Sequence, residues 1–298
     1  MVTEIDKKNY EEKGYVVIKG FVPNATIDNF LSIYKRKILK SKKKFFRNKI
    51  NKYERNKITE FGYAEQSFLD VHNWNNIPEF KETILDILLN PEMQDALKII
   101  NGFSSHKLMQ SMFFDLNTET VGHQDYWYLD SVPGGHLMGA WIACENIKKE
   151  AGRFFVLEGT HKLSFYEEGI SHEIWLEKIK NFIDKNPRLL KAPKLNKGDL
   201  LLWNSKLIHG AEPIIDKKFS RKSITAHFLP EELDFGNLFT KKEWVKFGNH
   251  NGYKYFANQP EYSRKAAFAS SFKQFFYNRP KALSLLRKIQ RMISNKFR

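Results

Sequence analysis

His123, Asp125 and His209 constrain this chain more than any other feature of its sequence. On a β-strand, residues two apart point to the same face of the sheet. The tripeptide His123-Gln124-Asp125 is therefore predicted to present an imidazole and a carboxylate to one point, with Gln124 pointing away. His209 supplies a second imidazole from a distant segment. Two histidines and one carboxylate on one face of a metal suit non-haem Fe(II), because they leave coordination positions open for small molecules.

A second group of polar residues follows His209 along the chain. Lys197-Gly198-Asp199 predicts a tight turn, and the apolar run after it predicts a short buried strand that leads to His209. In the next predicted strand, 220–228, Arg221, Ser223 and Thr225 share one face. A guanidinium fork and a hydroxyl are suited to a carboxylate. A metal triad beside a carboxylate clamp predicts a dicarboxylate cosubstrate that chelates the metal at one end, and 2-oxoglutarate is the candidate.

The order of the predicted elements indicates a mainly β fold with flanking helices. Apolar residues recur at helical spacing after Pro23-Asn24, with Asn24 as a candidate cap, and again over 76–100, where Pro91 starts a second helix. The basic stretch 35–57 is expected to continue the first helix or to form a loop. From 107 to 228 the patterns favour strands, except for a helix around 173–183. With the metal triad, this order predicts a double-stranded β-helix, the cupin-like jelly roll.

Composition adds limits on location and partners. The chain has a single cysteine, Cys144, which excludes an intrachain disulfide, and it lacks a predicted signal peptide or transmembrane segment, so a cytoplasmic location is expected. The formal net charge of +15 indicates attraction to an anion or merely a lysine-rich composition. Residues 281–298 predict a basic amphipathic helix, which either packs on the core or makes peripheral contact with an anionic membrane. The sequence does not specify an oligomeric state.

Several segments together resemble the phytanoyl-CoA dioxygenase family of Fe(II)/2-oxoglutarate oxygenases. They are, in chain order, Tyr10–Ile18, Gln110–Phe114, His123-Gln124-Asp125, Gly139–Ala143, Gly152–Lys162 and Arg221–Phe228. The resemblance covers about residues 8 to 230. It implies an oxygenase domain over 1–230, with a helical N-terminal part and a jelly-roll core at about 107–230, and leaves 231–298 as a C-terminal extension that ends in the basic helix.

The resemblance also assigns roles to single residues. It implies that Met112 contacts 2-oxoglutarate, that Trp141 lies beside it, and that Gln124 belongs to the cosubstrate-binding group. Fe(II), 2-oxoglutarate and O2 are the implied cofactor and cosubstrates, with His123, Asp125 and His209 as the catalytic metal ligands. Ala211 stands where the family often has a small hydroxyl residue, so one hydrogen bond to the cosubstrate is expected to be missing.

The predicted function is hydroxylation of an unactivated C–H bond in a small molecule. The substrate class stays open among anionic, CoA-linked and glycan compounds. Because Asp125 is present, hydroxylation is favoured over halogenation. Two alternatives share the fold: a nucleic-acid demethylase, which the positive charge suggests, and a jelly-roll binding module without activity. The first is disfavoured because its usual second arginine would fall on His227, and the second because the triad is intact.

Overall fold

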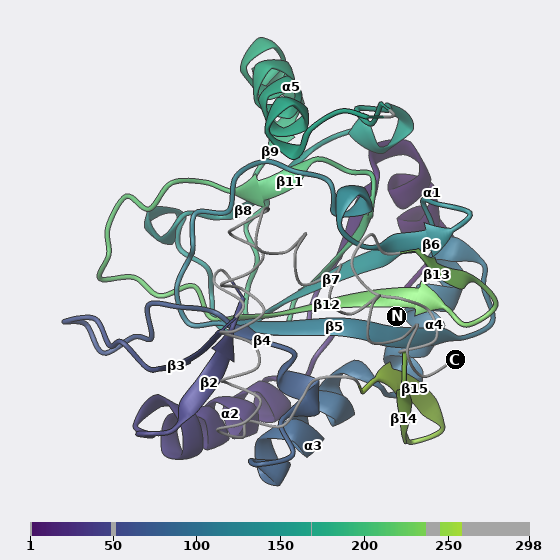
Figure 1. Ribbon diagram of the computed structural model, residues 1–298. Helices are drawn as coiled ribbons and strands as arrows, with labels where there is room; N and C mark the ends of the chain where they lie inside the picture. The colour runs from purple at the N-terminus through teal and green to yellow at the C-terminus, as the bar shows by residue number, and fades with distance from the viewer. Residues whose placement is uncertain (1, 49–51, 168, 237–244, 258–298) are drawn as a thin grey trace, which may run out of the picture.

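The structure of the protein is a computed structural model that describes residues 2–48, 52–167, 169–236 and 245–257. The predicted basic helix at 281–298 lies outside these residues. The described part contains a large sheet, a small sheet that faces it, and helices on both outer sides (Figure 1). None of its helices is both long and apolar enough to cross a lipid bilayer.

Strands make up the centre of the molecule. In chain order they are β1 (Tyr15–Ile18), β2 (Lys44–Arg47), β3 (Lys52–Arg55), β4 (Phe68–Leu69), β5 (His106–Phe114), β6 (Asp130–Val132), β7 (Met138–Ala143), β8 (Phe154–Leu157), β9 (Leu190–Lys191), β10 (Leu200–Asn204), β11 (His209–Ala211), β12 (Ser223–Pro230), β13 (Asp234–Gly236), β14 (Phe247–His250) and β15 (Tyr253–Phe256). The large sheet runs in the order β1-β10-β7-β12-β5-β4-β2-β3, and the small sheet in the order β11-β8-β9. These two facing sheets confirm the predicted jelly roll.

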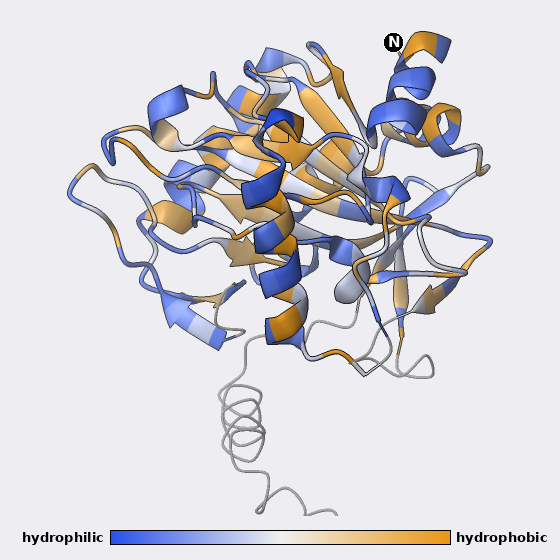
Figure 2. Cartoon of the chain, turned by 90° about the horizontal axis from the view of Figure 1, so that it is seen from above, coloured by the Kyte–Doolittle hydropathy of each residue, from blue (hydrophilic) through white to orange (hydrophobic). Residues whose placement is uncertain are grey.

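The helices lie outside the two sheets. They are α1 (Glu4–Lys13), α2 (Asn24–Ile33), α3 (Pro78–Leu88), α4 (Pro91–Asn101) and α5 (His172–Lys185), with a π-helical turn at Tyr34–Leu39 and short 3₁₀ turns at Val71–Asn73, Asp125–Trp127, Lys149–Ala151, Thr160–Lys162 and Pro187–Leu189. Helices α2 and α3 cover the lower face of the large sheet, and α5 lies above the small sheet (Figure 1). Figure 2 looks down on α5 and shows apolar residues alternating with polar ones along it, as expected of a helix with one buried side.

A period of two divides the side chains of the large sheet between two cores. On β12, Ile224, Ala226 and Phe228 pack among the helices, whereas the alternate residues Ser223, Thr225 and His227 face the interval between the sheets. In the same way, the helix-facing residues of β7 and β10 belong to the larger core, and Trp141 and Trp203 belong to the core between the sheets. The interior face of the jelly roll is therefore where polar residues of β12 meet aromatic ones.

Three local predictions are wrong. His123 and Asp125 do not share a strand: His123 forms an isolated bridge, and Asp125 begins a 3₁₀ turn. The basic stretch 35–57 continues the first helix only through the π-helical turn that ends at Leu39, and it then forms the antiparallel pair β2 and β3 in place of a loop. In β2 the alternate residues Phe45 and Arg47 are buried. Asn24 is the first residue of α2 and not its cap, since Pro23 occupies the cap position without a side-chain hydrogen bond.

The described part of the C-terminal extension packs on the jelly roll. Strand β13 pairs with β6, and Tyr255 of β15 is in register with Leu108 of β5. The carbonyl oxygen of Phe256 lies 2.9 Å from His72 Nε2 and accepts a 2.8 Å hydrogen bond from Asn73. Residues 245–257 therefore help to close one side of the interior.

Gly139 provides a test of the packing between the sheets. It lies on the interior face of β7, where an added Cβ atom would be 2.0 Å from the ring of Trp203. Gly139→Ala should force this buried indole to move and lower the free energy of unfolding by about 1–3 kcal/mol. Chemical denaturation measures the change, and an unaltered unfolding midpoint would show that the indole does not occupy this space.

Candidate active site

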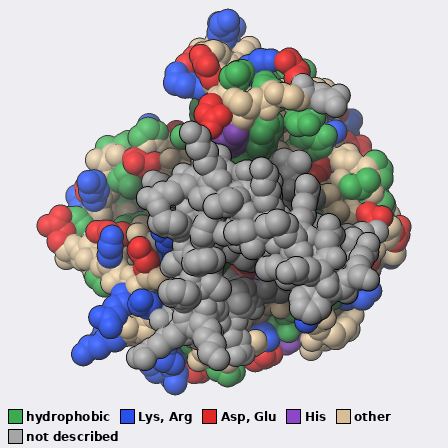
Figure 3. Space-filling view, viewed as in Figure 1, with side chains coloured by type: hydrophobic (Ala, Val, Ile, Leu, Met, Phe, Trp, Pro, Cys, Tyr) green, Lys and Arg blue, Asp and Glu red, His purple; other side chains and the backbone are tan. Residues whose placement is uncertain are grey.

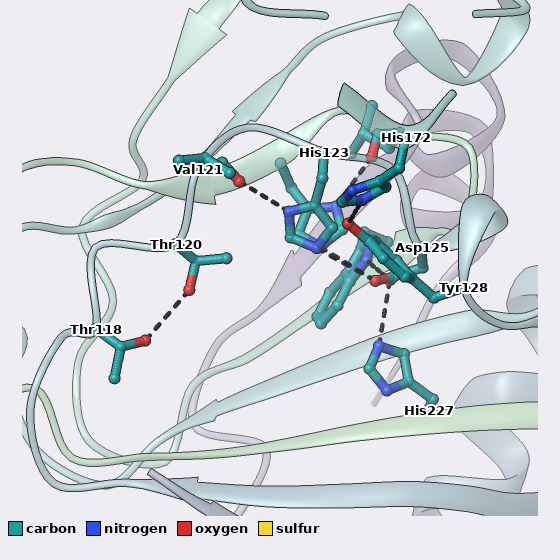
Figure 4. A network of polar contacts seen from close by, with 11 residues as sticks. Thr118, Thr120, Val121, His123, Asp125, Tyr128, His172 and His227 are labelled. Carbon is teal, nitrogen blue, oxygen red and sulfur yellow. Dashed lines mark hydrogen bonds and ion pairs between the residues drawn. The ribbon is translucent and has the colours of Figure 1, made fainter. Parts of the chain in front are cut away.

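His123 and His209 are brought together by the backbone. The N–H of His123 donates to the carbonyl of His209 at 3.0 Å, and the N–H of His209 returns a hydrogen bond of 2.9 Å to the carbonyl of His123. His209 begins β11, which pairs with β8 in the small sheet. Asp125 follows at the start of a 3₁₀ turn, and this turn directs its carboxylate back toward the two imidazoles (Figure 4).

The three side chains converge on one point. Asp125 Oδ1 lies 3.6 Å from His123 Nε2 and 3.6 Å from His209 Nε2, and one ligand atom from each residue lies within 4.8 Å of the others. Ligand atoms about 2.0–2.2 Å from a shared metal ion are separated by comparable distances. These residues therefore form a group that could hold a metal ion, although His123 and Asp125 do not lie on a common strand.

The protonation of both imidazoles suits metal binding. His123 Nδ1 lies 2.9 Å from the carbonyl oxygen of Val121, and His209 Nδ1 lies 3.0 Å from that of Leu207. A carbonyl only accepts, so each Nδ1 carries the proton and each Nε2 presents a lone pair. Burial lowers the pKa of His209 to about 4, which keeps this imidazole neutral. Burial also opposes protonation of His123, but the hydrogen bond and charge of Asp125 outweigh it and raise its pKa.

The second oxygen of Asp125 is held by two further residues. The indole Nε1 of Trp203 donates to Asp125 Oδ2 at 2.8 Å, and His227 Nε2 lies 3.2 Å from the same atom (Figure 4 shows the His227 contact). Burial would raise the pKa of Asp125, but favourable electrostatic interactions with the neighbouring imidazoles and the hydrogen bonds of His123 and His227 hold it well below its usual value. Asp125 is therefore an ionised carboxylate with Oδ1 directed at the two metal-ligating nitrogens.

A small cavity of about 100 Å³ lies beside this group, and Arg221 is part of its lining. Arg221 is 3% exposed, and its guanidinium lies 5.9 Å from the ring centres of Phe114 and Trp141. Its hydrogen bond is a long one, 3.5 Å to the carbonyl oxygen of Gly152, and its Nε has no partner. No carboxylate pairs with it among the described residues, and burial alone lowers its pKa to about 10. Such a cation favours an anionic ligand.

The other predicted cosubstrate residues are placed differently from one another. Met112 and Trp141 line the same cavity as Arg221. Ser223 lies on the interior face of β12, but its hydroxyl points to the carbonyl of Arg221 at 3.5 Å and does not line the cavity. The amide of Gln124 donates to the carbonyl of Lys206 and does not line the cavity, so its placement does not fit the cosubstrate-binding role that the resemblance implied.

Sequence reasoning placed Thr225 on the face of Arg221 and Ser223 without giving it a role, and it missed the role of Trp203. Thr225 lines the cavity directly between Trp141 of β7 and Met112 of β5, its register partners. Its place two residues after Ser223 was the available signal. Trp203 was taken only as part of a buried strand, and nothing in the sequence indicated that its indole reaches Asp125.

A larger cavity of about 540 Å³ adjoins the small one. The two share six lining residues: Asn48, Met112, Thr120, His123, Asp125 and His227. Of the two cavities, Arg221 lines only the small one. The candidate metal ligands therefore lie at the boundary between a small compartment with a buried cation and a larger compartment of mixed polarity.

Comparison with known proteins agrees with this arrangement. The sequence model of the family described as Phytanoyl-CoA dioxygenase (PhyH) matches residues 10–223. The chain belongs to the phytanoyl-CoA dioxygenase family. It is 27% identical over 248 residues to human peroxisomal phytanoyl-CoA dioxygenase, covering 79% of this chain and 70% of the relative. It is 23% identical over 243 residues to a probable phytanoyl-CoA dioxygenase of Caenorhabditis elegans, covering 76% and 75%.

Solved structures of more distant proteins share the fold. One is the non-haem α-ketoglutarate-dependent carbocyclase SnoK from nogalamycin biosynthesis, with a TM-score of 0.57, 14% identity, and coverage of 78% of this chain and 84% of that one. Another is EctD from S. alaskensis with 2-oxoglutarate and 5-hydroxyectoine, with a TM-score of 0.56, 16% identity and 76% coverage of both chains. The family member described here is an Fe(II)- and 2-oxoglutarate-dependent dioxygenase, and Fe(II), 2-oxoglutarate and O2 are its cofactor and cosubstrates.

The hydrogen bond from Trp203 to Asp125 can be tested directly. Trp203→Phe removes the indole N–H but keeps an aromatic ring, so Asp125 should lose one of the two contacts that orient it. We expect Fe(II) affinity to fall by about 10–100-fold, as is usual when a group behind a metal ligand is removed. Anaerobic competition with a chelator measures the affinity. Trp175→Phe, a matching change at a buried indole that stacks on Trp127, should leave the affinity unaltered.

Proposed function

We propose that His123, Asp125 and His209 bind Fe(II) and that Arg221 binds the distal carboxylate of 2-oxoglutarate. The observation that carries this proposal is the buried, unpaired guanidinium of Arg221 in a cavity that also reaches the three candidate ligands. A buried charge without a partner is costly, and a bound carboxylate would offset that cost. Met112, Trp141 and Thr225 would enclose the carbon chain of the cosubstrate, and Ser223 would position the Arg221 backbone.

The residues of the site would orient the reactants and exclude water. When Fe(II), 2-oxoglutarate and O2 are bound, their chemistry hydroxylates a C–H bond while 2-oxoglutarate is converted to succinate and CO2. Trp203 and His227 would hold Asp125 as a ligand through one oxygen. The cavity shared with His123 would present the substrate to the side of the metal site opposite Arg221. Because Asp125 occupies the carboxylate position, we propose hydroxylation and not halogenation.

The primary substrate is proposed to be a small molecule bound in the larger cavity. Relatives and fold neighbours differ in this respect: the human relative is named for phytanoyl-CoA, SnoN was solved with nogalamycin RO, and EctD with 5-hydroxyectoine. Anionic, CoA-linked and glycan substrates all fit a cavity of about 540 Å³ that opens to solvent. Exposed cations gather around β2, at the lower left of Figure 3, and would suit phosphates that extend from the opening.

The two alternatives receive no specific support. A nucleic-acid demethylase would use an arginine at the position of His227, but this imidazole contacts Asp125 inside the site. An inactive binding module would not require a buried, ionised carboxylate grouped with two imidazoles.

Removal of a metal ligand should abolish turnover. His123→Ala deletes one of the two imidazoles, so the remaining pair should not retain Fe(II) in a reactive geometry. We expect loss of iron-dependent succinate formation from 2-oxoglutarate, measured under air with ascorbate. His250→Ala, on β14, serves as a control because its partners are Glu82 and Asp86. Succinate formation that persists in His123→Ala would overturn the assignment of the triad.

Removal of the Arg221 cation should lower the affinity for 2-oxoglutarate alone. Arg221→Ala should raise the 2-oxoglutarate concentration for half-maximal turnover by at least about tenfold, because a charge-assisted contact contributes roughly 1.5–3 kcal/mol. Arg221→Lys should restore affinity only in part, since an ammonium cannot form the planar fork. Titration of anaerobic Fe(II) protein with 2-oxoglutarate, followed by absorption, measures the affinity. Arg188→Ala, at an exposed arginine, is the control, and equal affinities in Arg221→Ala and Arg188→Ala would place the carboxylate elsewhere.

A further inference from the structure

Three polar side chains in the larger cavity have no side-chain partner among the described residues. Asn48, Asp70 and Gln110 line this cavity and come from three different segments. Among the described residues, the side chains of Asn48 and Gln110 make no hydrogen bond or ion pair, and the Asp70 carboxylate has only a backbone contact at Ser111. Tyr128 of the same lining differs, because its hydroxyl bonds to His172. The remaining lining is largely apolar: Leu69, Met109, Met112, Val121, Leu129, Phe235 and Phe256. A carboxylate and two amides are therefore left for a ligand within a mainly apolar wall.

The backbone holds Asp70 in an uncommon conformation. Its φ is +48°, in the left-handed region, which is uncommon for residues other than glycine. Asp70 directly follows β4, its N–H donates to the carbonyl of Ser111 at 2.6 Å, and the next residues form a 3₁₀ turn fixed by a hydrogen bond from His72 N to Ser111 Oγ. Residues kept in such conformations cluster at ligand-binding sites. The turn is thus rigid, and it carries its carboxylate at the cavity wall.

Burial also makes the ionised form of the Asp70 carboxylate unfavourable. Burial raises its pKa from 3.8 to about 7, and only a backbone hydrogen bond near Ser111 opposes this rise. Neither lysine nor arginine is found among the described residues that line the cavity. A buried carboxylate with only one backbone contact among the described residues would be stabilised further by a ligand that donates a hydrogen bond.

Strand register places this group next to the metal site. Leu69, the residue before Asp70, is in register with Met112, and Gln110 is in register with His227. His227 in turn contacts Asp125 at 3.2 Å. Arg221, two residues before β12 begins, lines the small cavity instead. Asp70 and Gln110 therefore face the substrate compartment and not the cosubstrate compartment.

We propose that Asp70, with Gln110 beside it, binds a hydroxyl or ammonium group of the primary substrate. The proposal rests on the proposed function, because it assigns the substrate of the same site. The portion of the substrate inside the cavity is then a neutral or cationic compound with O–H or N–H donors, such as a sugar, a polyol or an amine. A phosphate or carboxylate beside Asp70 would be repelled by it and would meet no lysine or arginine among the described lining residues. The apolar lining contacts the carbon skeleton of this group.

Two substitutions separate the contributions of charge and shape. Asp70→Asn removes the charge, keeps the size, and is tolerated in the left-handed region. Asp70→Gly removes the side chain at a backbone conformation that glycine adopts without strain. Glu119→Gln is the matched control, because Glu119 also has a positive φ of 51° but lines neither cavity. Each protein is assayed for succinate release stimulated by methyl glucoside, myo-inositol, glucosamine, spermidine and phytanoyl-CoA.

The proposal expects stimulation of the wild type by at least one donor-bearing compound. Asp70→Gly should then raise the concentration for half-maximal stimulation by at least about tenfold, with a smaller effect on the 2-oxoglutarate requirement. An ammonium group predicts a similar loss in Asp70→Asn, whereas a hydroxyl predicts a loss below about fivefold, because the asparagine carbonyl still accepts. Glu119→Gln should match the wild type.

Other outcomes overturn the proposal. They are stimulation by phytanoyl-CoA alone, stimulation that survives Asp70→Gly, or a wild type that no donor-bearing compound stimulates. The proposed function fails separately, if the wild-type Fe(II) protein does not bind 2-oxoglutarate.

Stability provides a readout that needs neither metal nor substrate. The folded-state pKa of Asp70 is raised, so wild-type stability should fall as pH rises from about 4 to about 7, where the folded protein retains a proton that the unfolded chain has lost. Asp70→Asn should not show this fall in stability, because asparagine does not titrate. Its melting temperature should therefore exceed that of the wild type above pH 7, and the difference should shrink toward pH 4. A variant that is less stable than the wild type at pH 8 would show that the carboxylate has a partner, and would overturn the proposal.

Discussion

The hydrogen bonds to Asp125 are the interaction on which the site depends. A buried carboxylate is unfavourable unless it is paired, and Asp125 reaches an ionised state because Trp203 and His227 contact one oxygen while His123 and His209 face the other. Trp203 belongs to β10 and His227 to β12, so the large sheet orients this ligand. His209 belongs to the small sheet. The metal site therefore exists only when the two sheets are packed together.

Alternation along β12 organises what surrounds that site. Residues that face the helices are apolar and stabilise the larger core, while Ser223, Thr225 and His227 follow one another across the interior. Because successive interior residues lie two apart, the strand leads from the cosubstrate side, where Arg221 precedes it, to the substrate side, where His227 adjoins Gln110. One strand thus supplies both compartments, and a shift of its register by one residue would remove them together.

Much of the fold and part of the site could be predicted from sequence, for identifiable reasons. The periodicity of apolar residues predicted α3, α4 and α5, and it predicted which alternate residues of β12 share a face. Burial of one face of an element imposes this periodicity on the sequence. The prediction that His123 and Asp125 lie together was correct, but the strand from which it was argued was wrong. An isolated bridge at His123 and a 3₁₀ turn at Asp125 bring the two side chains together. The roles of Trp203 and Asp70 could not be predicted, since both depend on contacts between segments far apart in sequence. The family comparison, and not periodicity, indicates the cosubstrate.

Arg221 and Asp70 illustrate one physical constraint in opposite directions. Neither side chain has an ionic partner among the described residues, and burial displaces the pKa of each toward its neutral form. An interior optimised only for stability would pair or replace both, because each costs free energy in the empty protein. Ligands that bind only the folded state repay such a cost, and they stabilise the fold by mass action. The cation on one side of the metal ligands and the anion on the other therefore select two ligands of different charge, so that each compartment disfavours the ligand of the other.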